Sequence, residues 1–135
     1  MTMFFLALDT TRRQIAWVRA GHDPAIIYDP RLDSFSELGG SGVALGVDSK
    51  WIYEENQKTN FSNGQIILLG TDGIWEVRNK EGEMLGKEPI IKIVRQNSSS
   101  GATQIIDSIF ETLDEFIGGV KIEDDITAVV IKAKN

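Results

Sequence analysis

The chain has 135 residues, of which 41% are hydrophobic and 25% are charged, as in an ordinary globular protein. Its 20 acidic residues outnumber its 14 Lys and Arg residues, and the net charge of −6 argues against a nucleic-acid-binding surface. Cysteine is absent and His22 is the single histidine, which excludes disulfide frameworks, thiolate zinc sites and multi-histidine metal sites. A bound metal would therefore be held mainly by oxygen.

The longest apolar run near the start, residues 3–8, is far shorter than the roughly 20 residues that cross a membrane. It also lacks the basic flank of a signal peptide. We therefore expect a cytoplasmic chain that makes no membrane contact of its own. The length fits one domain, without internal repeats or low-complexity tracts.

The first half of the chain predicts strands separated by turns. Extended segments are expected at residues 3–8, 14–18 and 25–28, joined as an antiparallel meander. A glycine-rich loop follows over residues 39–46. Residues 51–59 alternate weakly before the turn Ser62-Asn63-Gly64, which predicts a further hairpin.

The second half combines two strands with two helices. The continuous apolar run at residues 66–69 predicts a strand buried on both faces, and another strand is expected over residues 126–133. Between them, a short helix is predicted with Pro89 in its first turn. Residues 103–117 are predicted to form a longer helix with one apolar stripe, which Gly118 ends. Helices that follow a run of strands indicate the α+β class.

Two acidic residues stand at strand ends. Asp72 follows the strand at 66–69 and Asp124 precedes the strand at 126–133, so the backbone could bring both carboxylates to one cleft. Hard ions such as Mg²⁺ and Mn²⁺ prefer carboxylate and water oxygens, and Gly73 would permit a close backbone approach. Aspartate before glycine is also common turn chemistry. The residues alone leave both interpretations open.

Several motifs resemble those of the PPM, or protein phosphatase 2C-like, superfamily. In chain order they are Leu8-Asp9, Ala20-Gly21-His22-Asp23-Pro24, Leu45-Gly46, Leu68-Leu69-Gly70-Thr71-Asp72-Gly73-Ile74-Trp75-Glu76-Val77-Arg78-Asn79, Gly82-Glu83-Met84-Leu85-Gly86 and Asp124-Asp125-Ile126-Thr127-Ala128-Val129-Val130. They span nearly the whole chain and are most similar to the bacterial branch of stage II sporulation protein E and sigma-regulator phosphatases. This resemblance implies an antiparallel β-sandwich flanked by helices. It also implies a pair of Mn²⁺ or Mg²⁺ ions in a complete site, and hydrolysis of phosphoserine or phosphothreonine by a metal-activated water.

The resemblance assigns roles by position. Asp72 matches the metal-ligand aspartate of the Thr-Asp-Gly motif, and Asp124 matches the ligand aspartate of the Asp-Asp or Asp-Asn motif. Asp125 takes the second place of that pair, and it and Gly73 are candidate supporting residues or ligands. Arg78 is a candidate phosphate contact, with a solvated surface charge as the alternative.

One part of the family pattern is missing. The upstream Asp-x-x-Gly-His-Gly motif, which supplies a bridging aspartate, a glycine carbonyl and a general-acid histidine, does not occur, so no catalytic residue is assigned. His22 belongs to a different motif and is interpreted as a structural hydrogen-bonding residue. We expect residues 1–135 to form a single partial PPM-type domain whose N-terminal part is missing. Strands left unpaired by that gap would favour a homodimer.

Two functions are compatible with these patterns. The first is a metal-dependent protein serine/threonine phosphatase domain in bacterial sigma-factor or stress signalling, acting on a phosphorylated protein such as an anti-sigma-factor antagonist. The second is a non-catalytic, truncated phosphatase-fold module that binds a phosphoprotein or relays a signal. A receiver domain or a haloacid-dehalogenase-like phosphatase fits less well, since each needs an acidic motif after the first strand. The missing upstream motif leaves open whether the chain is an enzyme.

Overall fold

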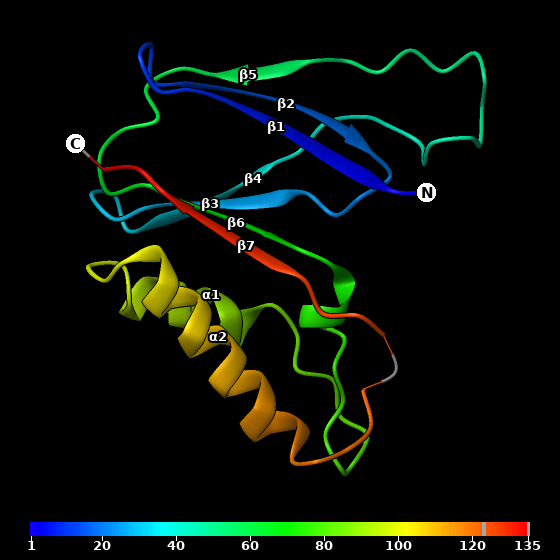
Figure 1. Ribbon diagram of the computed structural model, residues 1–135, viewed down its shortest axis with the longest axis vertical. Coiled ribbons are helices and arrows are strands. Elements are labelled where there is room, and N and C mark those ends of the chain that lie inside the picture. The colour runs from blue at the N-terminus through cyan, green and yellow to red at the C-terminus, as the bar shows by residue number, and fades with distance from the viewer. Residues whose placement is uncertain (123, 135) are drawn as a thin grey trace.

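The computed structural model describes residues 1–122 and 124–134, and these form three layers: two antiparallel sheets and a layer of helices (Figure 1). The first sheet has the order β1-β2-β5 and contains β1 (Met3–Asp9), β2 (Gln14–Ala20) and β5 (Asn56–Lys58). The second has the order β4-β3-β6-β7 and contains β3 (Ala25–Asp29), β4 (Ser34–Leu38), β6 (Ile66–Gly70) and β7 (Ala128–Lys132). The short 3₁₀-helix η1 (Asp72–Ile74) follows β6, and the helices α1 (Glu88–Gln96) and α2 (Ala102–Ile117) precede β7.

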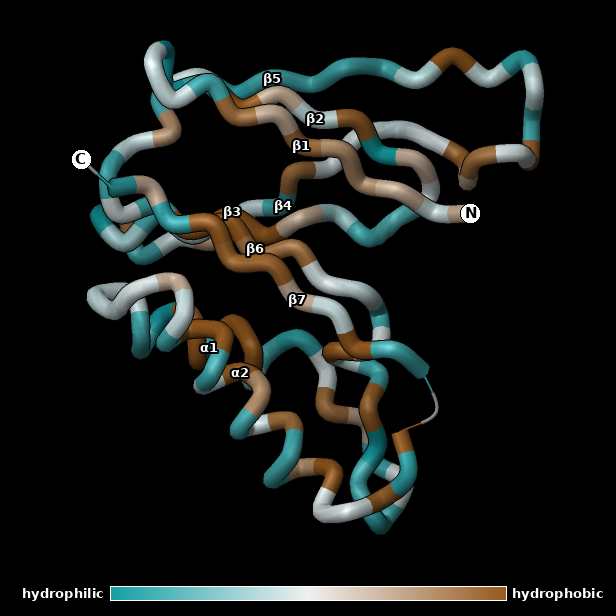
Figure 2. Tube along the Cα trace, viewed as in Figure 1, coloured by the Kyte–Doolittle hydropathy of each residue, from teal (hydrophilic) through white to brown (hydrophobic). Residues whose placement is uncertain are grey.

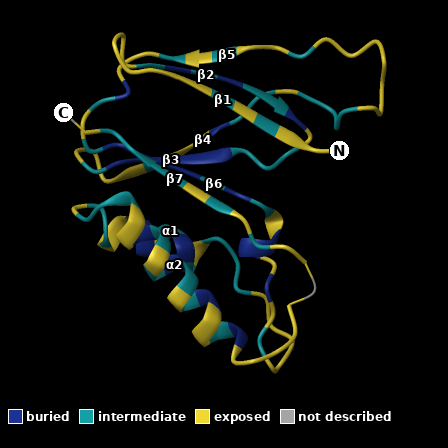
Figure 3. Ribbon diagram, viewed as in Figure 1, coloured by how far each residue is buried: buried dark blue, intermediate teal, exposed yellow. Residues whose placement is uncertain are grey.

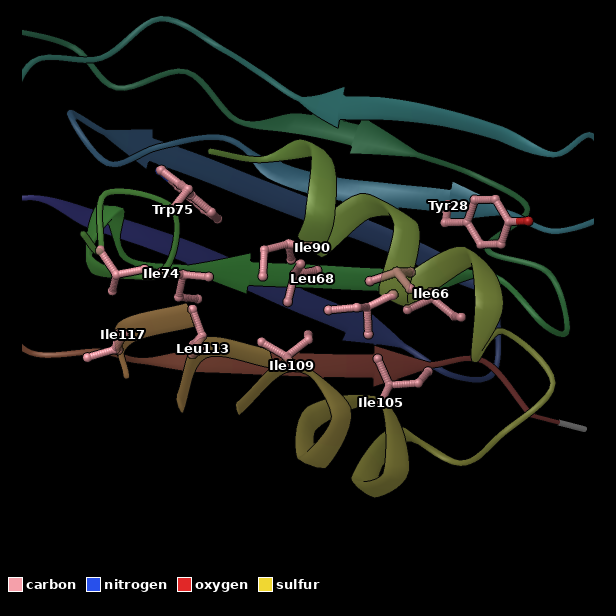
Figure 4. Close-up of a cluster of buried hydrophobic side chains, with 13 residues drawn as sticks. Tyr28, Ile66, Leu68, Ile74, Trp75, Ile90, Ile105, Ile109, Leu113 and Ile117 are labelled. Atoms are coloured by element: carbon pink, nitrogen blue, oxygen red, sulfur yellow. The ribbon is translucent and has the colours of Figure 1, made fainter. Parts of the chain in front are cut away.

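The second sheet is the middle layer, and it has a hydrophobic core on each face. The core between the two sheets contains Ile15, Trp17, Ala25, Ile27, Leu38, Phe61 and Ile67. The core between the second sheet and the helices contains Tyr28, Ile66, Leu68, Ile74, Trp75, Val77, Ile90, Ile93, Val94, Ile105, Ile109, Leu113 and Ile117 (Figure 4). The continuous apolar sequence of β6 is explained by this position, because alternate side chains enter opposite cores.

The central strands of the middle layer are the most apolar and most deeply buried part of the molecule. Figure 2 shows the hydrophobic residues of β3 and β6 gathered at the centre, and Figure 3 shows the same strands as buried. The predicted burial of the strand at residues 66–69 on both faces is therefore confirmed.

Both predicted helices are present. Pro89 lies in the first turn of α1, where its missing N–H leaves no hydrogen bond unmade. Helix α2 buries Ile105, Ile109, Leu113 and Ile117 along one side, and Gly118 ends it in the left-handed region with φ of 58°. In the part of the chain that the structure describes, no helix is long and apolar enough to cross a membrane.

The α+β sandwich is confirmed, but the strand pairing in the first half differs from the predicted meander. β2 pairs with β1 and β5, whereas β3 pairs with β4 and β6, so the chain changes sheets between β2 and β3. The predicted hairpin after residues 51–59 is also wrong, because β5 pairs with β2. The strand β4 was not predicted, since its Ser-Phe-Ser-Glu-Leu sequence is largely polar. The pairings of β5 with β2 and of β6 with β3 join distant residues, whereas β3 and β4 form a local hairpin.

Candidate functional site

The ends of β6 and β7 meet at one edge of the middle sheet. The strands run antiparallel, and Gly70, the last residue of β6, pairs with Ala128, the first residue of β7. Asp72 begins η1, directly beyond β6, while Asp124 and Asp125 lie in the segment that leads into β7. The strand register therefore brings the predicted metal-ligand segments to the same edge.

Thr71 ties these two segments together. Its backbone N–H donates to the carbonyl oxygen of Thr127 at 3.1 Å, and its hydroxyl donates to the carbonyl oxygen of Asp125 at 3.3 Å. The hydroxyl oxygen also accepts the backbone N–H of Thr127 at 3.1 Å. Thr71 thus satisfies backbone groups beyond the end of the β6–β7 ladder and fixes the entry to β7 beside η1.

Gly73 allows the two segments to come very close. A methyl group added to its Cα would lie 2.5 Å from the carbonyl oxygen of Asp125, which is too short for a carbon–oxygen contact. The expectation that Gly73 permits a close backbone approach is therefore confirmed. Asp125 contributes only its backbone carbonyl to this contact, and the residue is exposed.

The carboxylates of Asp72 and Asp124 each accept one local hydrogen bond. One oxygen of Asp72 accepts the N–H of Gly73 at 3.1 Å, and one oxygen of Asp124 accepts the N–H of Asp125 at 2.8 Å. Both residues are exposed, and within residues 1–122 and 124–134 neither forms an ion pair. Their remaining lone pairs can therefore accept a further ligand.

The donor chemistry of this pair suits a hard divalent cation such as Mg²⁺ or Mn²⁺, which prefers oxygen ligands. Among the described residues, no group of three or more His, Cys, Asp or Glu side chains lies close enough to hold a metal ion. Asp72 and Asp124 alone can therefore form only part of a hard-cation site. Water or another polypeptide segment would supply the remaining ligands.

A second set of contacts holds Trp75, the residue that follows η1. The indole N–H of Trp75 donates to the carboxylate of Asp23 at 3.1 Å, and the ammonium of Lys87 lies 4.9 Å from the centre of the Trp75 ring. Lys87 also lies 3.9 Å from the Asp23 carboxylate. The Trp75 ring packs over Gly70, where an added Cβ would lie 3.1 Å from a ring carbon. Trp75 therefore fixes the turn between β6 and Asp72.

His22 and Arg19 take part in backbone contacts. The Arg19 side chain donates to the carbonyl oxygens of His22 and Gly40, and a ring nitrogen of His22 lies 2.9 Å from the carbonyl oxygen of Asp23. The interpretation of His22 as a structural hydrogen-bonding residue agrees with these contacts. Its loop reaches the candidate site indirectly, through the hydrogen bond between Asp23 and Trp75.

A cleft of about 400 Å³ opens next to Asp124. The segment after η1 and the C-terminal end of α2 form its walls, and Figure 1 shows them close together beyond the end of the sheet. Gly73, Arg78 and Asp124 line it, so the structure brings these predicted site residues to one place. Asp72 is not among the described residues that line the cleft. Asp125 lines a separate depression of about 550 Å³, which also includes Asp124.

Sequence reasoning missed the contributions of Asp23, Lys87 and two lysines of the cleft, Lys80 and Lys121. Asp23 occupies the variable place in the Ala-Gly-His-x-Pro motif, so the family pattern does not single it out. The lysines lie on segments far apart in the sequence. Only the packing of α2 beside the segment after η1 brings them together.

Comparisons with known proteins identify the family and the fold of this chain. The sequence model of the family described as Stage II sporulation protein E (SpoIIE) matches residues 1–134. Phosphoserine phosphatase RsbU of Bacillus subtilis is 25% identical over 134 residues, which cover 99% of this chain and 39% of RsbU. The chain therefore spans well under half of that relative.

Solved structures show the same fold. The SiaA-PP2C domain of Pseudomonas aeruginosa superposes with a TM-score of 0.84 and 22% identity, covering 98% of this chain and 52% of that one. The phosphatase domain of SpoIIE from Bacillus subtilis gives a TM-score of 0.72 and 19% identity, covering 98% of this chain and 56% of that one. With a family match over nearly its whole length and a PP2C-type α+β fold, the chain belongs to the stage II sporulation protein E family of PPM phosphatase domains.

Proposed function

We propose that this chain is part of a metal-dependent protein serine/threonine phosphatase domain, with the carboxylates of Asp72 and Asp124 as metal ligands. The observation that carries the proposal is that the segments of Asp72 and Asp124 meet at one sheet edge, each in a motif of its family. Both aspartates are exposed, and among residues 1–122 and 124–134 neither forms an ion pair. Mn²⁺ or Mg²⁺ suits these oxygen donors. A pair of such ions, when bound, supplies an activated water and stabilises a phosphoryl oxygen.

The residues around these carboxylates have supporting roles. Thr71 and Gly73 hold the Asp124–Asp125 segment against η1, so that Asp72 and Asp124 keep a fixed relation to one another. Asp125 fixes this relation through its backbone oxygen and is a candidate supporting residue or ligand. Arg78, in the cleft beside Asp124, is a candidate contact for the substrate phosphate.

The proposed substrate is a protein that carries phosphoserine or phosphothreonine. Support comes from the relatives, since RsbU is named a phosphoserine phosphatase and SpoIIE is described as a cell fate determinant with a phosphatase domain. A role in bacterial sigma-factor or stress signalling, with a phosphorylated anti-sigma-factor antagonist as the substrate, extends this comparison. We further propose that residues 1–135 form a single, partial phosphatase domain. They cover 52% of the length of the SiaA-PP2C chain and 56% of the length of the SpoIIE phosphatase-domain chain.

Phosphate release from a phosphoserine peptide, measured with and without millimolar Mn²⁺, tests this function. Turnover should require Mn²⁺ and should fall about 100-fold or more in Asp72→Asn and in Asp124→Asn. Asp107→Asn is the matched control, because Asp107 is an exposed aspartate on α2. Turnover that is unchanged in Asp72→Asn and Asp124→Asn would refute the proposed role of these carboxylates.

A second candidate function is a non-catalytic module that binds a phosphoprotein or relays a signal. The specific observation in its favour is that the described residues bring together no group of three or more metal-binding side chains. This module would bind a phosphoserine peptide without releasing phosphate at any Mn²⁺ concentration. Measuring binding and phosphate release on the same peptide separates the two functions.

A further inference from the structure

The cleft beside Asp124 has a mixed lining of apolar and cationic side chains. Its apolar residues are Val77, Met84, Ile117, Val120 and Ile122. Three of them are unusually exposed for their type: Met84 at 47%, Val120 at 36% and Ile122 at 49%. An exposed apolar cleft with a polar rim is typical of a surface that another molecule covers.

The cations of the cleft stand out against the charge of the whole chain. Arg78, Lys80 and Lys121 line it, together with the acids Glu76 and Asp124. The chain as a whole carries 20 acidic and 14 basic residues, so this cleft reverses the overall balance. If Asp124 is neutralised by a bound metal, as proposed above, Glu76 is the remaining acid among the described lining residues.

A hydrogen bond holds Arg78, and Lys80 lies near the end of α2. The guanidinium of Arg78 donates to the carbonyl oxygen of Gly82 at 2.7 Å, which braces the turn between Arg78 and Met84. The side chain of Lys80 reaches across the cleft towards the end of α2, where an added Cβ on Gly118 would lie 3.5 Å from its Cε. The two walls of the cleft therefore meet at Lys80.

Asp124 lies between this cleft and a depression whose charged lining residues are acidic. The depression is lined by Asp114, Asp124 and Asp125 together with apolar residues, and its described lining contains no Lys or Arg. A metal cation would be favoured on that side, whereas anionic groups would be favoured on the side of Arg78, Lys80 and Lys121. The charge distribution thus distinguishes a cation-binding side of Asp124 from a substrate-binding side.

We propose that the cleft between the segment after η1 and the end of α2 binds the polypeptide of the substrate phosphoprotein. The bound segment would carry acidic and large apolar side chains beside the phosphorylated residue. Its apolar side chains would pack on Met84, Val120 and Ile122, and its carboxylates would pair with Lys80 and Lys121. The inference rests on the proposed function in placing the phosphate next to Asp124.

Fluorescence anisotropy tests this assignment without turnover. The probes are two labelled phosphoserine peptides, one flanked by leucine and glutamate and the other with lysine in place of each glutamate. The unmodified protein, without added metal, should bind the glutamate peptide about tenfold more tightly than the lysine peptide. The double variant Lys80→Glu with Lys121→Glu should reverse this preference, because both lysines are exposed and line the cleft.

Lys50→Glu is the matched control, because Lys50 is exposed and does not line the cleft. It should retain the preference for the glutamate peptide, and thermal unfolding should show that all variants are folded. Equal binding of both peptides, or equal effects of the control and the double variant, would overturn the proposal. A dimer in sedimentation that only the double variant disrupts would also overturn it, since a second copy would then occupy the cleft.

The proposed phosphatase function is measured in a separate assay from peptide binding. Phosphate release from the glutamate peptide with Mn²⁺ measures catalysis, whereas anisotropy measures docking. Selective binding without phosphate release would support the cleft and reject catalysis. Phosphate release with unselective binding would reject the cleft and support catalysis.

Discussion

The indole N–H of Trp75 and the carboxylate of Asp23 form a hydrogen bond of 3.1 Å between residues that are 52 positions apart. Trp75 follows η1, whose first residue is Asp72, and Asp23 belongs to the loop that carries His22. Two motifs that are distant in sequence are therefore joined directly. Asp23 thus positions the turn that carries Asp72, through Trp75.

Removing the Asp23 carboxylate should weaken this brace. Asp23→Ala leaves the largely buried indole N–H without its acceptor, and we expect a loss of about 1–2 kcal/mol in the free energy of unfolding. Asp23→Asn keeps an oxygen acceptor, so its free energy of unfolding should fall much less. Urea unfolding followed by tryptophan fluorescence measures both, and equal stabilities of the two variants would contradict the role of the acceptor.

Gly73→Ala tests the contact between η1 and the segment before β7. The new methyl group would lie 2.5 Å from the Asp125 carbonyl oxygen, so the backbone must move, at a cost of about 1–3 kcal/mol in unfolding free energy. Gly39→Ala is the control, because nothing lies within 4 Å of a Cβ there. If thermal unfolding shows the same small change for both, the close approach is not important for stability.

The buried stripe of α2 should dominate the attachment of the helix layer. Ile109 is 0% exposed, and we expect Ile109→Ala to lower the unfolding free energy by about 2–5 kcal/mol. Ile52 is 85% exposed, so Ile52→Ala should change it by about 0.5 kcal/mol or less. Chemical denaturation of the two variants makes the comparison, and similar losses would show that the helix does not pack as described.

Asp29 should make the stability of the fold depend on pH. Two hydrogen bonds from the Arg31 side chain, at 3.1 Å and 2.8 Å, and one from Gln65 at 2.7 Å hold the pKa of the Asp29 carboxyl well below its usual range. A folded pKa below the unfolded value of about 3.9 gives stability that is present above that pH. This stability is lost as the pH falls towards the folded pKa.

Asp29→Asn isolates this contribution. At pH 7 the variant should be less stable than the unmodified chain by about 1–3 kcal/mol, because it loses the charged acceptor of Arg31. The difference should shrink as the pH falls below about 4, where the unmodified chain begins to lose the same interaction. Urea midpoints measured from pH 7 to about pH 2.5 give the curve. A difference that stays constant with pH would assign the effect to something other than the Asp29 charge.

Local sequence patterns predicted much of this fold. The stripe that includes Ile105 and Ile109 marks the buried side of α2, and Gly118 ends the helix as expected. The apolar run of β6 indicated a strand buried on both faces. These features could be predicted because periodicity and helix-ending residues act over a few positions.

Contacts between distant segments could not be predicted in the same way. The polar strand β5 joins β2 rather than forming a hairpin, and β6 pairs with β3 across a long stretch of sequence. Lys80 and Lys121 share a cleft only because α2 ends beside the segment after η1. Asp72 and Asp124 were an exception, since the family motifs and the positions of both residues at strand ends pointed to one edge.

Binding of Mn²⁺ to this chain tests the central claim most directly. Electron paramagnetic resonance of a Mn²⁺ titration reports the free ion, so it measures binding without requiring turnover. We expect the unmodified chain to bind Mn²⁺, and Asp72→Asn and Asp124→Asn to bind it about tenfold or more weakly. Asp107→Asn, altered on the exposed surface of α2, should bind as the unmodified chain does. Identical titrations for all four proteins would contradict the assignment of Asp72 and Asp124 as metal ligands.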